Sequence, residues 1–303
     1  MTYSCVVEEG LPAGFRLDRY VAEHLRLLTR SQVKARSLRA AVNGRDVKIS
    51  KALKAGDLLD LAWAEPEPST LIPEDIPLEI LYEDERVVVI NKAQGMVVHP
   101  GAGNRRGTLA NALLFRKGAN AGEPFRPGIV HRLDKDTSGV IIAAYDSEAL
   151  TFLADQFKRR RVGKTYAALV QGTPRSPAGV IKTRITRDPR NRTRFTVSED
   201  TGKTALTRYR TVRSWGAYSL LLLRPKTGRT HQLRVHLRAL GHPVAGDPLY
   251  GGGGSLMLHA SRLCLRLPGG APEPRLFKAP LPRRFYALIE SLGQRRPVSR
   301  SRF

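Results

Sequence analysis

The sequence HRLDKDTSG at residues 131–139 runs directly into the apolar segment VIIAA at residues 140–144. A histidine, two basic and two acidic residues therefore lie within six positions, just before a segment with the length and composition of a buried strand. A carboxylate at the end of a buried strand loses hydration, which disfavours its charged form unless a cation lies beside it. This pattern predicts a polar site, with carboxylates and cations, at the end of a core strand.

The overall charge indicates the kind of partner. The chain has 303 residues, with 51 Lys plus Arg against 27 Asp plus Glu, which gives a formal net charge of +24. Positive charge in such excess repels itself in a compact molecule and indicates a polyanionic partner. We expect this partner to be RNA and not a membrane, because no segment approaches the ~18 consecutive apolar residues of a spanning helix. A basic enzyme without a nucleic-acid partner is the weaker alternative.

The cysteines and histidines bear on location and on metal binding. Cys5 and Cys264 are the only cysteines and lie far apart, which fits a reducing compartment without a disulfide framework. Residues 1–14 show neither the basic start nor the apolar run of a signal peptide, so we expect a cytoplasmic protein. His231 and His236 are separated by about 140° on a helix and cannot share one ion unaided. We therefore predict no metal, with His236 as a core histidine and His231 open to either role.

One stretch separates the chain into parts. Residues 64–77, AEPEPSTLIPEDIP, are rich in proline and acid and contain neither Lys nor Arg. In so basic a chain this composition is typical of a semi-rigid linker. It predicts a small N-terminal module at 1–63, the linker at 64–77 and a large body at 78–292. The basic residues 293–303, rich in Pro and Arg, are expected to form a poorly ordered tail.

The small module has the pattern of two helices followed by a hairpin. Apolar residues recur at helical spacing from Leu17 to Leu28, and Ser31 is placed to cap a second helix. Asn43-Gly44 favours a hairpin turn, and Lys54–Asp57 forms a further turn. This order resembles the S4 RNA-binding domain, and the resemblance implies phosphate contacts by Lys34, Arg36 and Arg39. The alternative is a small α/β cap that merely covers the body.

The body mixes strands and helices. We expect strands at Leu78–Tyr82, Val87–Ile90, Thr165–Val170, Ala205–Val212 and Ser219–Leu223, a helix capped by Ser147, and a helix at Thr230–Leu240 that stops at Gly241. The elements do not alternate as regular βαβ units. They therefore predict an α+β fold with a largely antiparallel mixed sheet and flanking helices.

Four segments of the body resemble the RluA family of pseudouridine synthases. They are HRLDKDTSG at 131–139, KTY at 164–166, TGRTHQLRVHL at 227–237 with its continuation to residue 251, and VVHPGAGN at 97–104. The last resembles the RluD branch of the family more than RluA itself. The resemblance spans residues 78–290 and implies the pseudouridine synthase fold, with a central RNA-binding cleft. It also implies conversion of uridine to pseudouridine in structured RNA, with no cofactor and no metal.

The resemblance assigns roles to individual residues. Asp134 matches the catalytic aspartate, which either attacks the ribose C1′ or abstracts a sugar proton, and both routes need an ionised carboxylate. Arg229 matches the arginine paired with that aspartate, which offsets its desolvation. Tyr166 matches a tyrosine that stacks on uracil and assists removal of the C5 proton. Arg132 matches an arginine that fills the gap left by a flipped nucleotide. Further substrate contacts are expected from His131, Lys164 and His231.

Two other classes of function compete with this hypothesis. A non-catalytic S4-type factor that binds rRNA or the ribosome explains the charge but not residues 131–139. A glycoside or nucleoside hydrolase needs a second carboxylate, and Asp136 is the one such residue near Asp134 in a comparable motif. We therefore predict a pseudouridine synthase that acts on RNA, foremost on large-subunit rRNA or a pre-ribosomal particle. We expect a monomer that needs no obligatory protein partner.

Overall fold

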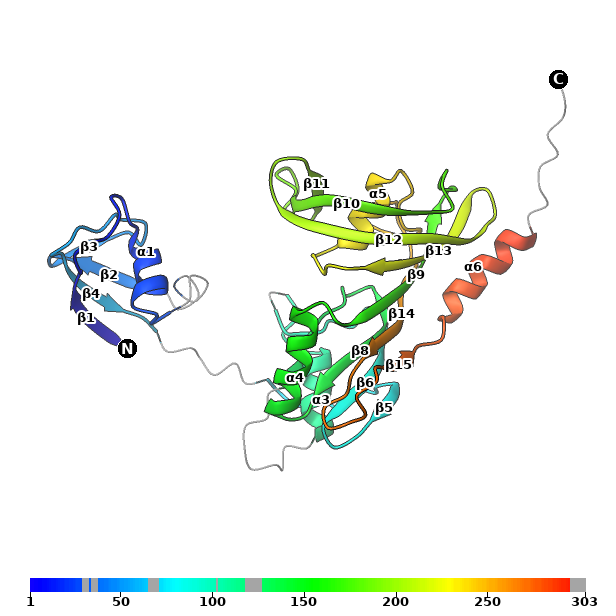
Figure 1. Ribbon diagram of the computed structural model, residues 1–303, viewed down its shortest axis with the longest axis horizontal. Helices are drawn as coiled ribbons and strands as arrows, with labels where there is room; N and C mark the ends of the chain where they lie inside the picture. The colour runs from blue at the N-terminus through cyan, green and yellow to red at the C-terminus, as the bar shows by residue number, and fades with distance from the viewer. Residues whose placement is uncertain (29–32, 34–37, 65–70, 102, 118–126, 295–303) are drawn as a thin grey trace, which may run out of the picture. The chain divides into compact units, whose positions relative to one another are not determined.

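The chain folds into two compact units, Met1–Thr70 and Leu71–Phe303 (Figure 1). The computed structural model describes residues 1–28, 33, 38–64, 71–101, 103–117 and 127–294. Each unit has hydrophobic clusters of its own. Residues 71–77, which we expected to belong to the linker, lie in the second unit. Within them, the carbonyl of Ile72 accepts a hydrogen bond from Asn111 Nδ2 at 2.8 Å.

The first unit contains a four-stranded antiparallel sheet in the order β1-β4-β2-β3. These strands are β1 (Thr2–Val6), β2 (Arg39–Val42), β3 (Arg45–Val47) and β4 (Leu58–Ala62). β2 and β3 are joined at Asn43 and Gly44, whose φ angles of 53° and 74° are those that an Asn-Gly hairpin turn requires. The predicted hairpin is thereby confirmed, as is the turn at 54–57, where Asp57 N donates to the carbonyl of Lys54 at 3.2 Å.

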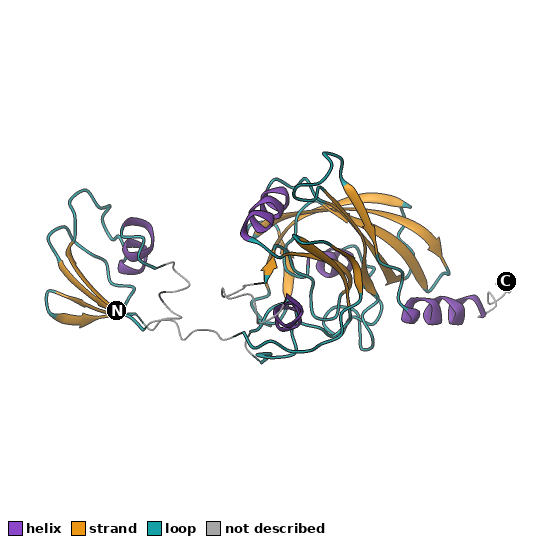
Figure 2. Ribbon diagram, turned by 90° about the horizontal axis from the view of Figure 1, so that it is seen from below, coloured by secondary structure: helices purple, strands orange, loops and turns teal. Residues whose placement is uncertain are grey.

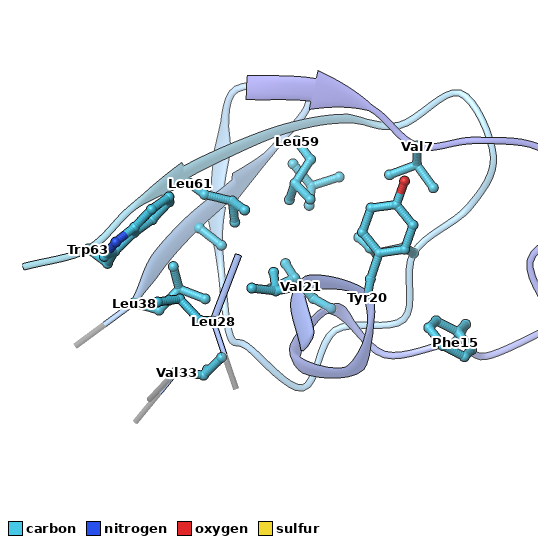
Figure 3. Packing of buried hydrophobic residues seen from close by; sticks show 14 residues of the cluster. Val7, Phe15, Tyr20, Val21, Leu28, Val33, Leu38, Leu59, Leu61 and Trp63 are labelled. Atoms are coloured by element: carbon cyan, nitrogen blue, oxygen red, sulfur yellow. The ribbon is translucent and has the colours of Figure 1, made fainter. Parts of the chain in front are cut away.

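The helical part of the first unit is shorter than predicted. α1 (Leu17–Arg19) continues as the π-helical turn η1 (Tyr20–His24), and the chain then turns at Arg26, which has a φ of 53°. The expected helix to Leu28 is therefore wrong beyond His24. Figure 3 shows how its buried side chains pack against the sheet, with Tyr20 and Val21 facing Leu59 and Leu61. The second predicted helix, with Ser31, Lys34 and Arg36, lies outside the described residues.

The second unit is built on an eleven-stranded sheet with the main order β11-β10-β12-β13-β9-β14-β8-β6-β5. Two further strands pair at its side, β15 with β14 and β7 with β8. The strands are β5 (Ile80–Glu83), β6 (Val87–Lys92), β7 (Gly128–Ile129), β8 (Ser138–Ala144), β9 (Gly163–Gln171), β10 (Ala178–Arg187), β11 (Phe195–Ser198), β12 (Lys203–Ser214), β13 (Tyr218–Pro225), β14 (Leu258–Leu265) and β15 (Arg275–Lys278). Of these strand pairs, β8 with β14 is parallel and the others are antiparallel. The predicted α+β class with a largely antiparallel sheet is confirmed.

Helices cover both faces of this sheet (Figures 1 and 2). They are α3 (Leu109–Lys117), α4 (Ser147–Lys158), α5 (Gln232–Ala239) and α6 (Arg283–Gln294). Every residue of β8 is buried, because its alternate side chains pack in the cluster with α4 and in the cluster with α3. In the other half of the sheet, α5 packs on one face and α6 on part of the opposite face. In the ranges described, no helix is long and apolar enough to cross a membrane.

The helix boundaries differ slightly from the sequence predictions. α4 is capped by Asp146, whose Oδ1 accepts from Ala149 N at 2.7 Å, and not by Ser147. α5 begins after His231, whose φ of 55° interrupts the helical path, and ends before Gly241 with a φ of 86°. Because α5 starts only after His231, Arg229 lies in the loop before the helix and Arg234 lies in its first turn.

Candidate active site

A cavity of about 450 Å³ lies where three distant segments of the second unit meet. Its walls come from the loop before β8, from the end of α4 with the start of β9, and from the connection between β13 and α5. These walls include parts of the matched segments at 131–139, 164–166 and 227–237. The fourth matched segment, 97–104, is not among the described residues that line it. The fold therefore brings most of the predicted site residues to one place.

Asp134 lies in the loop that leads into β8, and backbone hydrogen bonds hold this loop in place. Thr137 N donates to the carbonyl of Asp134 at 3.1 Å, which closes a tight turn. The carbonyl of Lys135 accepts from Gly95 N at 2.9 Å and from Lys92 Nζ at 3.1 Å. Burial lowers the pKa of Lys92 to about 8, although the charges of Asp136 and Asp134 partly oppose this shift. The backbone around Asp134 is thus held from two sides, while its side chain stays 22% exposed in the cavity.

The cation beside Asp134 is Arg234, in the first turn of α5. Its Nη1 lies 3.5 Å from Asp134 Oδ2. Its Nε and Nη2 bind both carboxylate oxygens of Asp247, at 2.7 and 2.8 Å. Asp247 is fully buried and also accepts from the backbone N–H groups of Leu249 and Tyr250. The guanidinium is therefore fixed in place, and its remaining nitrogen points at Asp134.

Arg234 stays charged in this buried position. Burial disfavours its charged form, but the hydrogen bonds and charge of Asp247, followed by the charge of Asp134, raise the pKa of Arg234. A buried arginine that lost Asp247 would lose both of its short hydrogen bonds to a carboxylate. The three side chains therefore form one unit, in which Asp247 orients Arg234 and Arg234 faces Asp134.

The expected pairing of Arg229 with Asp134 is wrong. Arg229 precedes α5, and its Nε donates to the carbonyl of Thr204 at 3.1 Å. Its backbone N–H donates to Gln232 Oε1 at 3.0 Å, so the loop is fastened to the helix start. Arg229 lines the same cavity but does not pair with Asp134. Sequence reasoning missed Arg234, because its need for a carboxylate such as Asp247 follows from its burial in α5, which the structure shows.

Tyr166 forms part of the cavity wall. It lies on β9 opposite Leu223 of β13 and packs in the cluster that includes Leu233 and Leu258. Burial, followed by the charge of Asp134, raises the pKa of the Tyr166 hydroxyl. This hydroxyl makes no hydrogen bond with the described residues. A neutral ring therefore stands in the cavity, with its hydroxyl free to meet a ligand.

The side chain of His131 makes its contacts with β8 and α4, although His131 also lines the cavity. Its Nε2 accepts from Ile142 N of β8 at 3.1 Å, and its ring stacks on Phe157 with centroids 4.5 Å apart. Burial, followed by the charge of Lys164, lowers the pKa of His131 to about 3. The imidazole is therefore neutral, and its accepting Nε2 assigns the proton to Nδ1. Lys164 Nζ lies 6.0 Å from the centroid of the Phe157 ring, on the same wall.

The cavity has a basic rim. His231 Nδ1 lies 2.9 Å from the hydroxyl of Tyr250, and His231 lines the wall next to Arg234. Exposed or half-exposed basic residues surround the opening, namely Arg132, Lys158, Arg160, Lys226 and Arg229. His236 is fully buried and bonds to Thr183 and Thr207, so its predicted core role is confirmed. Within the described ranges no three His, Cys, Asp or Glu side chains gather in a way that could hold a metal ion.

Known proteins match this chain over most of its length. Residues 86–239 match the family described as RNA pseudouridylate synthase. Ribosomal large subunit pseudouridine synthase D of Borreliella burgdorferi is 43% identical over 294 residues, which cover 92% of this chain and 90% of that protein. The protein of the same name from Xylella fastidiosa is 46% identical over 242 residues, which cover 79% of this chain and 72% of that protein.

Solved structures of proteins with the same family name are also similar to this chain. Human RNA Pseudouridylate Synthase Domain Containing 4 superimposes with a TM-score of 0.57 at 30% identity, over 72% of this chain and 94% of that chain. Human RNA Pseudouridylate Synthase Domain Containing 1 gives a TM-score of 0.54 at 29% identity. Since the family match begins just before β6 and ends at the last residue of α5, it includes Asp134, Arg234 and the residues that line most of the cavity. The chain therefore belongs to the RluA family of RNA pseudouridine synthases, enzymes that isomerise uridine in RNA to pseudouridine.

Proposed function

We propose that this enzyme modifies uridine in large-subunit ribosomal RNA, with Asp134 as its catalytic residue. The observation that carries the proposal is the position of Asp134, which lies in the cavity and faces an arginine that Asp247 holds in place. The names of the relatives from Borreliella and Xylella support the choice of RNA. The net charge of +24 supports a large polyanionic substrate.

Asp134 acts on the ribose of the target nucleotide. Arg234 provides a positive charge beside the carboxylate, because its Nη1 is fixed 3.5 Å away. An ionised oxygen serves equally for attack on C1′ and for abstraction of a sugar proton, the two routes that the motif leaves open. In either route the bond between C1′ and N1 breaks and a bond between C1′ and C5 forms. The C5 proton leaves and N1 gains one, so the product is an isomer of the substrate.

The cavity walls hold the detached base. Tyr166 places an aromatic ring next to Asp134, which suits stacking on uracil while the base turns. Its neutral hydroxyl then takes part in moving the C5 proton. Arg132, exposed at the opening, fills the gap that the flipped nucleotide leaves in the RNA. Arg229 at the rim and Lys164 on the wall bind phosphate and sugar groups, and His231 also lines the cavity.

The first unit extends the RNA contact as an S4-like module. Its small antiparallel sheet carries Arg39 at an exposed position of β2. Lys34 and Arg36, predicted on the preceding helix, lie outside the described residues. Basic groups on such a module bind phosphates regardless of sequence. We place the reaction in the cytoplasm with its rRNA substrate, and we expect a monomer to suffice.

The experiment is an assay with purified protein, buffer and RNA alone. Transcripts of large-subunit rRNA, small-subunit rRNA and tRNA are incubated separately, and pseudouridine is measured by nuclease digestion and mass spectrometry. We expect pseudouridine in the large-subunit transcript. Asp134→Asn should lower the rate by about 10⁴-fold, the upper end of what one positioned catalytic group contributes.

Asp136→Asn is the matched control for this substitution. It neutralises the neighbouring carboxylate and should retain measurable activity. Normal turnover by Asp134→Asn would refute the catalytic assignment. Modification of tRNA alone would refute the rRNA substrate and leave the role of Asp134 intact.

A further inference from the structure

The two faces of strands β10, β12 and β13 differ in chemistry. On β10, Thr183 bonds to His236 of α5, and on β12, Thr207 bonds to the same histidine. The odd-numbered residues of both strands therefore face α5. Since Gln232 and Arg234 of α5 line the cavity, this is also the cavity side of the layer. The even-numbered residues point to the opposite side.

The opposite side carries a group of exposed cations, here called the outer basic face. It consists of Lys182 and Arg184 on β10, Arg208 and Arg210 on β12, and Arg224 on β13. Strand register places Arg208 directly opposite Arg224 on one side and opposite Val180 on the other. Cations therefore repeat about every 7 Å along β10 and along β12, and Arg208 and Arg224 lie about 5 Å apart across neighbouring strands. The other cations of the face lie opposite uncharged residues. The result is a broad surface of positive charge.

These cations have no partner within the described part of the chain. None of their side chains makes an ion pair or a hydrogen bond there, in contrast to Arg86, Arg116 and Arg234, which bind carboxylates. Like charges at directly opposed positions of a sheet destabilise it, as Arg208 and Arg224 must do. An external polyanion would relieve this repulsion and release its own counterions on binding.

The surroundings of these cations indicate which polyanion fits. The neighbouring positions on the same side are Ala178, Val180, Thr204, Leu206 and Leu222. Single-stranded RNA is bound through aromatic side chains on which bases stack, and the paired positions between these cations carry none. Double-helical RNA is bound through its phosphates and its shape, for which exposed cations spread over three neighbouring strands are suited.

We propose that the outer basic face is a second RNA-binding surface, which holds the backbone of a double-helical segment on the side of the sheet away from the cavity. The proposal deepens the proposed rRNA function, because such segments are present around modified sites in structured RNA. The RNA would then contact the catalytic unit on both sides of the β10–β12–β13 layer. The cavity would receive the target uridine, and the outer basic face would hold a neighbouring helix.

The test is a binding experiment with the full chain and a triple variant. Arg208→Gln, Arg210→Gln and Arg224→Gln remove the cations of β12 and β13 and keep long polar side chains. The control variant, Arg175→Gln with Arg262→Gln and Arg266→Gln, removes the same charge from exposed arginines whose side chains are also unpaired in the described structure. The probes are an RNA duplex of about 20 base pairs, longer than the ~16 that a double-stranded-RNA-binding domain covers, and an oligouridine strand.

We expect the triple variant to bind the duplex about tenfold more weakly, with a salt slope reduced by about 2 to 3, since each lost phosphate contact removes ~0.7–0.9. The control variant should keep the duplex affinity and salt slope of the wild type, and oligouridine binding should change little in either variant. Equal duplex binding by all three proteins would overturn the proposal and leave the face to an acidic protein. Equal weakening in both variants would also overturn it, as an effect of net charge.

Catalysis separates this proposal from the proposed function. Pseudouridine formation on a saturating rRNA transcript should be the same in the triple variant and in the wild type, which also shows that the variant folds. If no rRNA is modified but the duplex result holds, the rRNA substrate is wrong and the surface stands. If rRNA is modified and the duplex result fails, the surface is wrong and the function stands.

Discussion

Arginines on the two sides of the β10–β12–β13 layer differ in burial and in pairing: those toward the cavity include a buried arginine paired with carboxylates, and those on the other side are exposed and unpaired within the described structure. On the cavity side, Arg234 is 5% exposed and binds two carboxylates. On the other side, Arg208 and Arg224 are exposed and bind no described residue, although they lie opposite one another. A buried, paired cation fixes geometry, whereas an exposed, unpaired one acts over a distance and weakens with salt. Substitutions on the cavity side should therefore change turnover, and substitutions on the outer side should change affinity.

The largest effect expected on the cavity side, after loss of Asp134, is that of Tyr166→Phe. The substitution keeps the ring and removes a hydroxyl whose pKa burial and the charge of Asp134 raise. If the neutral hydroxyl assists proton transfer at C5, the rate should fall by about 10²-fold or more. Single-turnover measurement of pseudouridine on saturating rRNA checks this, with RNA affinity measured alongside. Full activity of the Phe variant would limit Tyr166 to stacking.

Arg234→Lys should have the next largest effect. Lysine keeps the positive charge but cannot bind Asp247 through two nitrogens while presenting a third to Asp134. We expect the rate to fall by about 10²-fold from misplacement alone. Arg234→Ala would in addition leave the buried Asp247 without its cation, which costs about 3–5 kcal/mol of stability. Rates on saturating RNA and unfolding midpoints separate the two effects.

Arg229→Lys is the control for the arginine comparison. Among the described residues its guanidinium binds the carbonyl of Thr204 at the rim and no carboxylate, so we expect no more than about a threefold change in rate. The two arginines are separated by four residues in one matched segment, but Arg234 is buried and bound to Asp247, whereas Arg229 is half-exposed and bound to a backbone carbonyl. A larger loss from Arg229→Lys than from Arg234→Lys would show that Arg229 is the functional partner of Asp134.

Substitutions of His131 test whether its hydrogen bond to β8 positions the loop that carries Asp134. Glutamine places an acceptor about where Nε2 meets Ile142 N, whereas asparagine places one near Nδ1. We expect His131→Gln to keep the rate within about threefold and His131→Asn to lose about tenfold through displacement of the loop. Equal rates for the two variants would mean that the bond to β8 does not position Asp134.

The same histidine gives a pH dependence of stability. Burial lowers the pKa of His131 from 6.5 to about 3, so below pH 6.5 the unfolded chain binds a proton that the folded protein excludes. Its contribution to stability is complete above pH 6.5 and is lost as the pH falls toward 3. The urea midpoint of the wild type should therefore fall more between pH 7 and about pH 4.5 than that of His131→Gln. Parallel curves would show that His131 becomes protonated in the fold.

The sequence identified the elements whose pattern is local. The all-apolar segment 140–144 indicated a buried strand, and β8 is buried along its whole length because helices cover both faces. Asn43-Gly44 indicated a hairpin because its backbone preference is intrinsic to those two residues. The strand pairing could not be derived in this way. β8 pairs with β14, more than a hundred residues later, and β14 has no local signal as strong.

The site shows the same division. The matched motifs were enough to identify Asp134, Tyr166 and the 227–237 segment as candidate site residues, and the structure places them in one cavity. They could not choose between Arg229 and Arg234, because that choice depends on where α5 begins. The left-handed backbone of His231 delays the helix and turns Arg234 toward the buried Asp247. That choice depends on three-dimensional packing, because the burial of Arg234 in α5 is what gives it two carboxylate partners.

The smallest effect on chemistry is expected from removal of residues 1–70. The first unit has its own core, and Asp134, Tyr166 and Arg234 all belong to the second unit, so the rate on saturating rRNA should change little. Affinity should fall and its salt dependence should flatten, because the basic groups of the S4-like module release counterions when they bind phosphates. The outer basic face remains in the truncated protein, so the part of the salt dependence of RNA affinity that comes from this face should remain. Undiminished affinity with an unchanged slope would make the first unit a structural cap, and would leave the catalytic unit to account for all binding of RNA.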